Sequence, residues 1–152
     1  ARVNAASTIG TSALAIADGH VEAVRVLLSH GADMEQSVCN GSTPLALAAC
    51  RGHVEVVAAL LQARASVFGE ALQMASFRGH VEVTRQLLDA GAEVNDAVGL
   101  LNAGEATTPL ITASIAGHES VVRLLLSARA DLTWIFEGNI SGRFKVDDVH
   151  NV

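Results

Sequence analysis

The apolar and polar positions of this chain of 152 residues follow a pattern that returns several times. Between residues 54 and 61, valine and leucine recur at separations of three and four residues, as on one face of an α-helix. The same apolar stripe returns at 21–28, 81–88 and 122–126. Each stripe predicts an amphipathic helix that buries one face against a neighbour.

A second, shorter helix is predicted before each stripe, most clearly in the stretch "GSTPLALAACRGHVEVVAALLQARAS". The Thr43 hydroxyl can cap a helix N-terminus, and Pro44 suits the first helical position. Gly52 stands where a left-handed residue ends a helix. The sequence therefore predicts one helix over residues 44–51 and another from about Val54.

Two independent markers show that this helix–turn–helix unit is repeated in tandem. Gly-His pairs are separated by 33, 27 and 38 residues, and an alanine followed by a polar and an apolar residue keeps steps of 31, 33, 27 and 38. The pairs stand at Gly19-His20, Gly52-His53, Gly79-His80 and Gly117-His118. A period near 33 predicts a tandem array, and the units must stack because none can bury its own apolar face. In the first helices, small side chains fall in register for close stacking: Ala15, Ala48, Ala75 and Ala113.

Composition and charge restrict the classes of function. Half of the residues are hydrophobic but only 3% are aromatic, so the core must consist of alanine, leucine and valine. The net charge of −6 argues against a nucleic-acid binder, and no apolar run is long enough to span a membrane. Cys39 and Cys50 form neither a metal motif nor a disulfide framework, so we expect an intracellular protein, cytoplasmic or nuclear.

The quoted stretch and "ATTPLITASIAGHESVVRLLLSARAD" resemble ankyrin repeats, through their Thr-Pro-Leu and Gly-His signatures. The resemblance implies an all-α solenoid of helix–turn–helix units joined by short hairpins and β-turns. It covers residues 1–133 as four repeats, at about 1–31, 32–64, 65–91 and 92–129. Residues 134–152 are expected to form a C-terminal cap or to begin a divergent repeat. The chain starts inside a hairpin ("ARVN"), so we expect a piece of a longer array.

The sequence departs from the ankyrin pattern at several positions. The histidine usual after Thr-Pro-Leu is replaced by Ala46 and Ile111, and the third repeat has Glu70-Ala71-Leu72 in place of Thr-Pro-Leu. Arg64 and Arg129 occupy the usual glycine position after the second helix. We expect both arginines to adopt the left-handed conformation, at a cost of about 1 kcal/mol each.

The repeated Gly-His-x-Glu invites comparison with a metal or catalytic site, but its spacing argues against one. Equivalent residues of stacked helices lie about 8–10 Å apart, whereas metal ligands converge within about 2 Å of one ion. We therefore expect the histidines to bond loop backbone and the glutamates to serve helix starts. No phosphate loop, zinc motif or nucleophile elbow is present, and Asp147-Asp148 is interpreted as a solvated pair. No catalytic, metal-binding or cofactor-binding residue is predicted.

The resemblance implies that a protein partner binds the hairpin tips and the exposed side of the first helices. The pairs that precede each Gly-His give a row with an apolar centre and two arginines. We call Cys50, Arg51, Phe77, Arg78 and Ile115 the first-helix row. The row suits a partner that presents an apolar ridge and one or two carboxylates, because aromatic and arginine residues anchor interfaces. Alternatively, Phe77 and Ile115 pack between adjacent repeats.

The hairpins supply the other candidate contacts. Ser42 and Thr107, next to the helix starts, complete the predicted partner-binding set. The hairpin of the third repeat is shorter than the others and that of the fourth is longer, which predicts a notch at 66–69 beside a projecting loop at 96–107. The alternative is tolerated variation in loop length. Asn95, in "LLDAGAEVN", resembles the asparagine that asparaginyl hydroxylases modify in ankyrin arrays, or it only stabilises a turn.

Three functional classes remain open at this stage. The first is a non-catalytic, monomeric protein–protein interaction module, a scaffold or adaptor, with no nucleic acid or membrane as partner. The second is a regulatory array that inhibits an enzyme partner. The third is a recognition domain attached to a catalytic domain outside this chain. The sequence identifies neither the partner nor the pathway.

Overall fold

The structure is a computed structural model that describes residues 3–4, 13–17, 19–37, 41–98 and 106–130. The described residues contain eight α-helices and one isolated antiparallel bridge, between Val98 and Thr107. The helices are α1 (Ala13–Ile16), α2 (Val21–Ser29), α3 (Pro44–Arg51), α4 (Val54–Gln62), α5 (Gly69–Arg78), α6 (Val81–Asp89), α7 (Pro109–Ile115) and α8 (Glu119–Ser127). The segment 134–152, expected to form a cap or a divergent repeat, lies outside the described residues.

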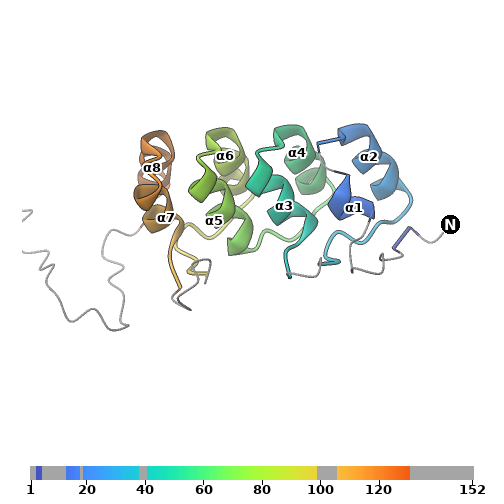
Figure 1. The fold of residues 1–152 in the computed structure, drawn as a ribbon, viewed down its shortest axis with the longest axis horizontal. Helices are drawn as coiled ribbons and strands as arrows, with labels where there is room; N and C mark the ends of the chain where they lie inside the picture. Colours follow the sequence, from blue (N-terminus) through green and yellow to red (C-terminus); the bar gives the residue numbers. More distant parts are fainter. Residues whose placement is uncertain (1–2, 5–12, 18, 38–40, 99–105, 131–152) are drawn as a thin grey trace, which may run out of the picture.

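Consecutive helices form antiparallel pairs, and the pairs stand in a single row (Figure 1). The first helices α1, α3, α5 and α7 form one layer and the second helices α2, α4, α6 and α8 form the other. Within each layer, every helix packs against the equivalent helix of the next pair. This arrangement confirms the predicted all-α solenoid.

The helix starts follow from local sequence. The Thr43 hydroxyl accepts a hydrogen bond from the Ala46 amide at 3.2 Å, and the Thr108 hydroxyl accepts one from the Ile111 amide at 3.4 Å. Each bond satisfies one of the amides that a helix leaves free in its first turn. In the third pair, Phe68 holds the capping position and makes no side-chain cap bond. The predicted cap at Thr43 is therefore confirmed, Thr108 supplies an equivalent one, and the missing Thr-Pro-Leu leaves α5 without one.

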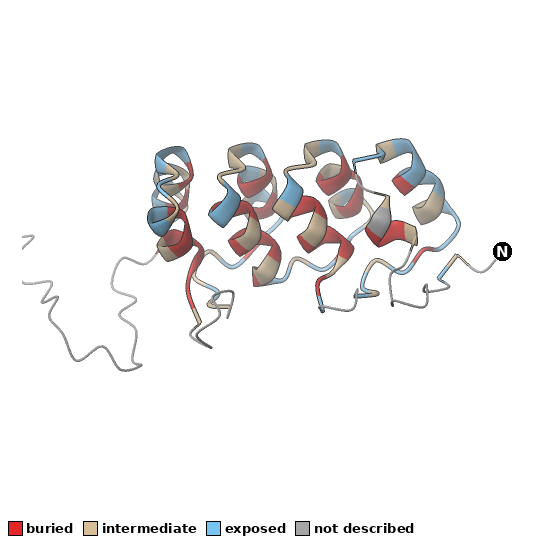
Figure 2. Cartoon of the chain, in the orientation of Figure 1, coloured by how far each residue is buried: buried red, intermediate tan, exposed pale blue. Residues whose placement is uncertain are grey.

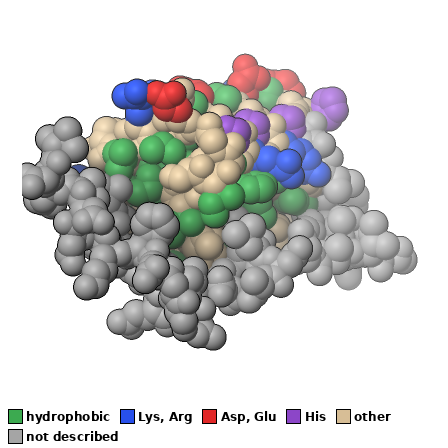
Figure 3. Space-filling model, turned by 60° about the vertical axis from the view of Figure 1, so that its left-hand side comes forward, with side chains coloured by type: hydrophobic (Ala, Val, Ile, Leu, Met, Phe, Trp, Pro, Cys, Tyr) green, Lys and Arg blue, Asp and Glu red, His purple; other side chains and the backbone are tan. Residues whose placement is uncertain are grey.

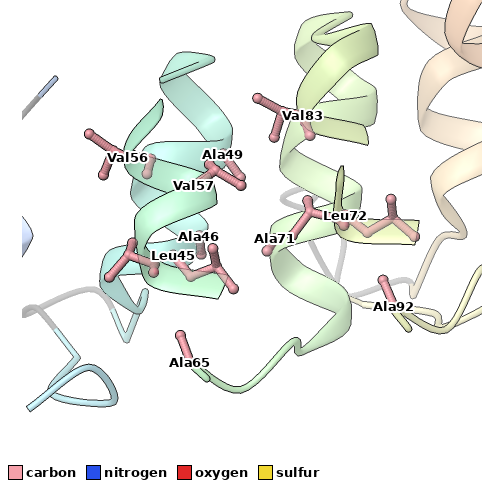
Figure 4. Packing of buried hydrophobic residues seen from close by; sticks show 14 of the residues in the cluster. Leu45, Ala46, Ala49, Val56, Val57, Ala65, Ala71, Leu72, Val83 and Ala92 are labelled. Atoms are coloured by element: carbon pink, nitrogen blue, oxygen red, sulfur yellow. The ribbon is translucent and has the colours of Figure 1, made fainter. Parts of the chain in front are cut away.

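The core lies between successive pairs and consists of small and branched aliphatic side chains (Figures 2 and 4). One leucine in most helices is at most 1% exposed: Leu45, Leu60, Leu72, Leu87 and Leu125. The predicted alanines of the first helices are buried as well, at 6% exposure or less: Ala15, Ala48, Ala75 and Ala113. Small side chains at these positions let neighbouring first helices approach closely enough to pack their leucines.

The two arginines that follow the second helices α4 and α8 adopt the left-handed conformation, as expected. Arg64 and Arg129 both have φ 67°, whereas the equivalent positions in the other units are Gly31 and Gly91. A side chain in this conformation places its Cβ close to the next carbonyl oxygen, which costs about 1–2 kcal/mol. The array therefore carries local strain at two of its turns.

Replacing Arg64 with glycine is expected to raise the free energy of unfolding by about 1 kcal/mol, because it removes this strain. Urea unfolding followed by circular dichroism measures the change. Gly31→Arg, the reverse replacement at the equivalent turn, should lower stability by a similar amount. Equal stability of the Arg64→Gly variant and the parent would contradict the strain.

Candidate functional site

The histidines of the Gly-His pairs connect one unit to the next. The Nε2 atom of His80 lies 3.1 Å from the carbonyl oxygen of Cys50, and that of His118 lies 3.0 Å from the carbonyl oxygen of Phe77. Each ring therefore donates a hydrogen bond to the last turn of the preceding first helix. The expectation that these imidazoles bond backbone is confirmed for His80 and His118.

In the first three Gly-His pairs, the glycine makes room for the histidine of the following unit, whereas nothing lies near Gly117. A Cβ atom on Gly52 would lie 2.7 Å from the His80 ring, and one on Gly79 would lie 2.6 Å from the His118 ring. Both glycines also have φ near 75°, a left-handed conformation. Two independent requirements therefore favour glycine at each of these positions: the left-handed backbone conformation, and the lack of space for a Cβ atom beside the histidine ring. Sequence reasoning identified the first requirement and missed the second.

These histidines do not gather into a metal site. Across the part of the chain that the structure describes, no group of three or more His, Cys, Asp or Glu side chains could hold an ion. The ring of His80 is engaged with Cys50 and Gly52 of the preceding unit. The repeated Gly-His pair is a device that joins units.

The first-helix row lies at the C-terminal ends of the first helices. Phe77 is 36% exposed and Ile115 is 66% exposed, while Cys50 is half-buried. The interpretation that Ile115 packs between repeats is therefore wrong, because α7 ends there and its side chain points to solvent. The Arg78 guanidinium carbon lies 5.8 Å from the centroid of the Phe77 ring, within the range of a cation–π contact.

Part of the row opens on a hollow between the second and third units. Leu47, Cys50, Arg51, Arg78 and His80 line it, with a volume of about 510 Å³, and we call it the α3–α5 hollow. On this side of the molecule, a row of histidines runs beside arginine and hydrophobic side chains (Figure 3). Leu47 was not predicted as a site residue. It lies one helical turn before Cys50 and Arg51, so a helical plot of α3 would have placed it on the same face.

Ser42 is not part of an exposed surface, contrary to the prediction. It is 4% exposed, and its hydroxyl donates a hydrogen bond to Oε1 of Glu70 at 2.7 Å. Glu70 lies in the first turn of α5, the first helix of the next unit, so the bond joins two units. A partner cannot reach Ser42 without separating them.

Thr107 is also buried, at 7% exposure, for an equivalent reason. Gln73, fully buried on α5, donates through its Nε2 atom to the Thr107 hydroxyl and to the Thr107 carbonyl oxygen, both at 2.6 Å. The same nitrogen lies 3.1 Å from the carbonyl oxygen of Val98. The prediction of a partner contact at Thr107 is therefore wrong, because this residue fastens the fourth hairpin to the third unit.

Replacing Gln73 with methionine is expected to lower the free energy of unfolding by about 2 kcal/mol, because the Thr107 hydroxyl and the carbonyl oxygens of Val98 and Thr107 lose their hydrogen bonds from the Gln73 amide. Amide hydrogen exchange should also accelerate at these two residues, whose amides bond each other's carbonyl oxygens. Gln62→Met, at an exposed position on α4, serves as the control and should change neither quantity measurably. Unchanged exchange in the Gln73 variant would show that the amide does not hold the hairpin.

The two remaining predictions concern the hairpins. The proposed notch is occupied in part, since a Cβ atom on Gly69 would collide with the Asp96 carboxylate. Residues 99–105 of the proposed projecting loop lie outside the described residues. Asn95 is half-buried, and its counterpart in the first unit, Asn4, accepts a hydrogen bond from the Asp33 amide at 2.7 Å. That bond joins the first hairpin to the next one, 29 residues further along the chain, so it supports a structural role for asparagine at this position.

Comparisons with known proteins agree with this architecture. Residues 3–70 and 64–134 each match the family model described as ankyrin repeats (3 copies). The chain is 46% identical over 56 residues to the potassium channel AKT1 of Oryza sativa, in both the indica and the japonica subspecies. It is 44% identical over 61 residues to the potassium channel AKT3 of the japonica subspecies.

These similarities cover 36% and 39% of this chain and only 6% and 7% of the channels. The matched segments are therefore a small part of the length of each channel. Among the helices that the structure describes, none is both long and apolar enough to cross a membrane. Together, the two family matches cover residues 3–134 and so include all eight helices that the structure describes. The chain belongs to the ankyrin repeat family.

Proposed function

We propose that this chain is a non-catalytic scaffold or adaptor module that binds a protein partner through the first-helix row and the α3–α5 hollow. Ankyrin repeats are generally protein-interaction modules. The observation that carries the proposal is an exposed Phe77 within cation–π range of Arg78, which itself lines the hollow together with Arg51. Aromatic and arginine side chains of this kind supply most of the binding energy of protein interfaces.

The anchors of the interface are Phe77, Arg78 and Ile115, because these side chains are exposed on adjoining first helices. Ser42 and Thr107 contribute indirectly, by holding the units that carry the anchors in register. The anchors are preorganised, since helices pack on both sides of α5 and little ordering is needed on binding.

Affinity capture from cell lysate tests this assignment. The parent is compared with a variant that carries Arg51→Glu, Phe77→Ala and Arg78→Glu. A matched control carries Arg25→Glu, Val26→Ala and Arg85→Glu on the second helices, where these side chains are exposed. Circular dichroism and unfolding establish that the three proteins are equally folded.

A partner that the parent and the control retain, and the row variant loses, supports the first-helix row as the interface. A partner that all three proteins retain contradicts it. Light scattering on the purified chain tests the accompanying proposal that it is a monomer. A dimer that the row variant fails to form would identify the row as a self-association surface instead.

A second candidate function is recognition within a larger protein. The support is that the matched segments of the potassium channels AKT1 and AKT3 are 6% and 7% of their length. An antibody against this chain would then detect a polypeptide much larger than 15.7 kDa in cell extract. A band at that mass alone would contradict the proposal.

Inhibition of an enzyme partner is the remaining alternative. Adding the purified chain to a captured enzyme would lower its activity if the chain covers the active site. Hydroxylation of Asn95 stays a prediction as well, and intact mass after incubation with an asparaginyl hydroxylase tests it. A mass without an added oxygen would exclude the modification.

A further inference from the structure

We propose that the outward face of the fourth unit is a docking surface for residues 134–136 of this same chain. Four side chains make up this surface, which we call the C-terminal face: Ile111 and Ser114 on α7, and Val122 and Leu126 on α8. The pair α7 and α8 stands at one end of the row of helix pairs (Figure 1). Two observations carry the proposal, the exposure of this face and the register of the residues that follow it.

The two α7 residues of this face are more exposed than the equivalent residues of the preceding units. Equivalent positions stand at the same distance before a Gly-His pair, six residues before its glycine for Ile111 and three for Ser114. Ile111 is half-buried and Ser114 is exposed. Their equivalents in the second and third units are at most 2% exposed: Ala46, Ala49, Gln73 and Ser76. A following unit therefore buries these positions.

The two α8 residues show the same difference. Val122 is half-buried, whereas its equivalents in the first three units are fully buried: Val24, Val57 and Thr84. Leu126 is 40% exposed, whereas its equivalents are half-buried: Leu28, Leu61 and Leu88. Each second helix before α8 packs against the next second helix, and no described helix follows α8. The C-terminal face is therefore the area that a neighbour covers in the other units.

The junction at Gly117 is open in the same way. In the first three Gly-His pairs, the histidine ring of the following unit lies 2.6 to 3.1 Å from the position of a glycine Cβ atom. Among the described residues, no atom lies within 4 Å of that position at Gly117. A unit of a solenoid cannot bury its apolar face alone and needs a neighbour that covers it. Ile111, Val122 and Leu126 thus form an apolar surface on which a neighbour can dock.

The fourth hairpin shows which part of the chain reaches such a face. Asp96 and Val98 stand four and six residues after Ala92, the alanine that follows α6. The Asp96 carboxylate lies beside Gly69 at the start of α5. The carbonyl oxygen of Val98 lies 3.1 Å from Nε2 of Gln73 on the same helix. Residues four to six positions after this alanine therefore lie along the preceding first helix.

The same register brings an apolar segment to the C-terminal face. Ala130 is the equivalent of Ala92, and the fourth to sixth residues after it are all apolar: Trp134, Ile135 and Phe136. By this count, Phe136 falls opposite Ile111 on α7. Residues 134–136 lie outside the described residues, and the register predicts where they dock.

The chemistry of the segment matches that of the face. In the third unit, the amide of Gln73 bonds the backbone of the next hairpin, whereas the apolar Ile111 takes that place in the fourth unit. An apolar segment suits this position, because a covered tryptophan or phenylalanine buries about 150–250 Å². Neither Thr-Pro-Leu nor Gly-His follows residue 133, so a short segment is a better occupant than a complete further unit.

Docking of this segment leaves the first-helix row accessible. Phe77 is 36% exposed although α7 packs against α5, so a neighbour does not bury the residue that stands two positions before the glycine. Ile115 is the equivalent of Phe77 and does not belong to the C-terminal face. The docking is therefore independent of partner binding through the row.

The fluorescence of Trp134 in the full chain tests the docking, because it is the only tryptophan and the chain has no tyrosine. The reference is a synthetic peptide of residues 131–139, in which water surrounds the indole ring. The parent should emit at a shorter wavelength than the peptide, and acrylamide should quench its emission less. Both differences should disappear in the urea transition that unfolds the array.

Leu126→Glu and Val26→Glu form a matched pair of variants. Both residues lie on second helices, at 40% and 57% exposure, but Val26 is on α2 at the other end of the array. In Leu126→Glu, the emission should shift toward that of the peptide, because a carboxylate is costly to cover with an apolar segment. Val26→Glu should keep the emission of the parent. Phe136→Ser, which changes the segment and not the helices, should shift the emission in the same direction as Leu126→Glu.

Circular dichroism establishes that each variant is folded, and Phe136→Ser decides the matter if Leu126→Glu is not. A parent that emits at the wavelength of the peptide would overturn the docking. Equal emission of all folded variants would contradict it as well, because Trp134 would then be covered elsewhere. Emission that moves to the wavelength of the peptide on dilution of the parent would assign the face to a second copy and rule out docking within one chain. None of these outcomes concerns the first-helix row, so failure of the docking is distinguishable from failure of the proposed function.

Discussion

Gly79→Ala is expected to lower the free energy of unfolding by about 2–3 kcal/mol, although it adds a single methyl group. The backbone at Gly79 has φ 77°, where any side chain is strained by about 1–2 kcal/mol. The new Cβ atom would also lie 2.6 Å from the His118 ring, which must move. Displacing that ring breaks its hydrogen bond to the Phe77 carbonyl oxygen, at a further cost of about 1 kcal/mol.

Gly31→Ala separates the two contributions. Gly31 has φ 79°, but no atom lies within 4 Å of the position of its Cβ, so this variant reports the backbone strain alone. The difference between the two variants, measured by urea unfolding, is the energy of the contact between units. Gly52→Ala should behave like Gly79→Ala, because its Cβ would meet the His80 ring at 2.7 Å.

A double-mutant cycle gives a stricter test. In a His118→Ala background, the ring is absent, so Gly79→Ala should cost no more than Gly31→Ala. Equal costs of Gly79→Ala with and without His118 would mean that glycine is required there by its backbone alone.

Leu72→Ala is expected to destabilise the array by about 3 kcal/mol. Leu72 is fully buried on α5, which packs against both α3 and α7, so the cavity would weaken two interfaces at once (Figure 4). Units of a solenoid contact only their neighbours, and a weak central unit therefore also weakens the coupling between the ends of the array.

Leu126→Ala is the matched control, because it removes the same side chain from an exposed position. Leu126 is 40% exposed on α8, and its truncation should change stability by less than about 1 kcal/mol. Urea midpoints measured by circular dichroism report both variants. A Leu72→Ala variant as stable as Leu126→Ala would mean that the space between units collapses around the missing side chain.

The elements of this fold could be predicted from the sequence because their signals are local. Thr43 and Pro44 mark the start of α3, and Gly52 marks its end. The left-handed conformation of Arg64 followed from its alignment with Gly31. Each of these conclusions depends on a residue and its near neighbours in sequence, or on comparing equivalent positions.

The contacts between units could not be predicted in the same way. The side chains of Ser42 and Gln73 meet partners 28 and 34 residues away, at distances that only the stacking of helices determines. Ser42 and Thr107 are predicted as partner contacts because the ankyrin resemblance implies binding at the hairpins, whereas the stacking of units buries both residues. Hydroxyls at equivalent positions of the second and fourth units were the available signal, since equivalent positions in a solenoid face a neighbouring unit.

The candidate site was predicted only in part, because the sequence shows which residues are equivalent but not how far apart their helices pack. Arg51, Phe77, Arg78 and Ile115 precede a fixed marker, and the structure exposes them all. The α3–α5 hollow was not visible in the sequence, because it depends on how far apart α3 and α5 lie. A pattern of equivalent residues thus indicates which side chains share a face, and the packing distance decides whether that face is ridged or recessed.

The contact between each glycine and the following histidine has a consequence for how the number of units can change. Removing residues 53–79 in frame would join Gly52 directly to His80 and bring His80 to the place against Gly19 that His53 now holds. The shorter protein would keep the same contact at each remaining junction. Recombination between Gly-His pairs can therefore delete or duplicate whole units and keep the Gly-His contact at each junction, whereas bonds such as that of Ser42 to Glu70 depend on which units become neighbours.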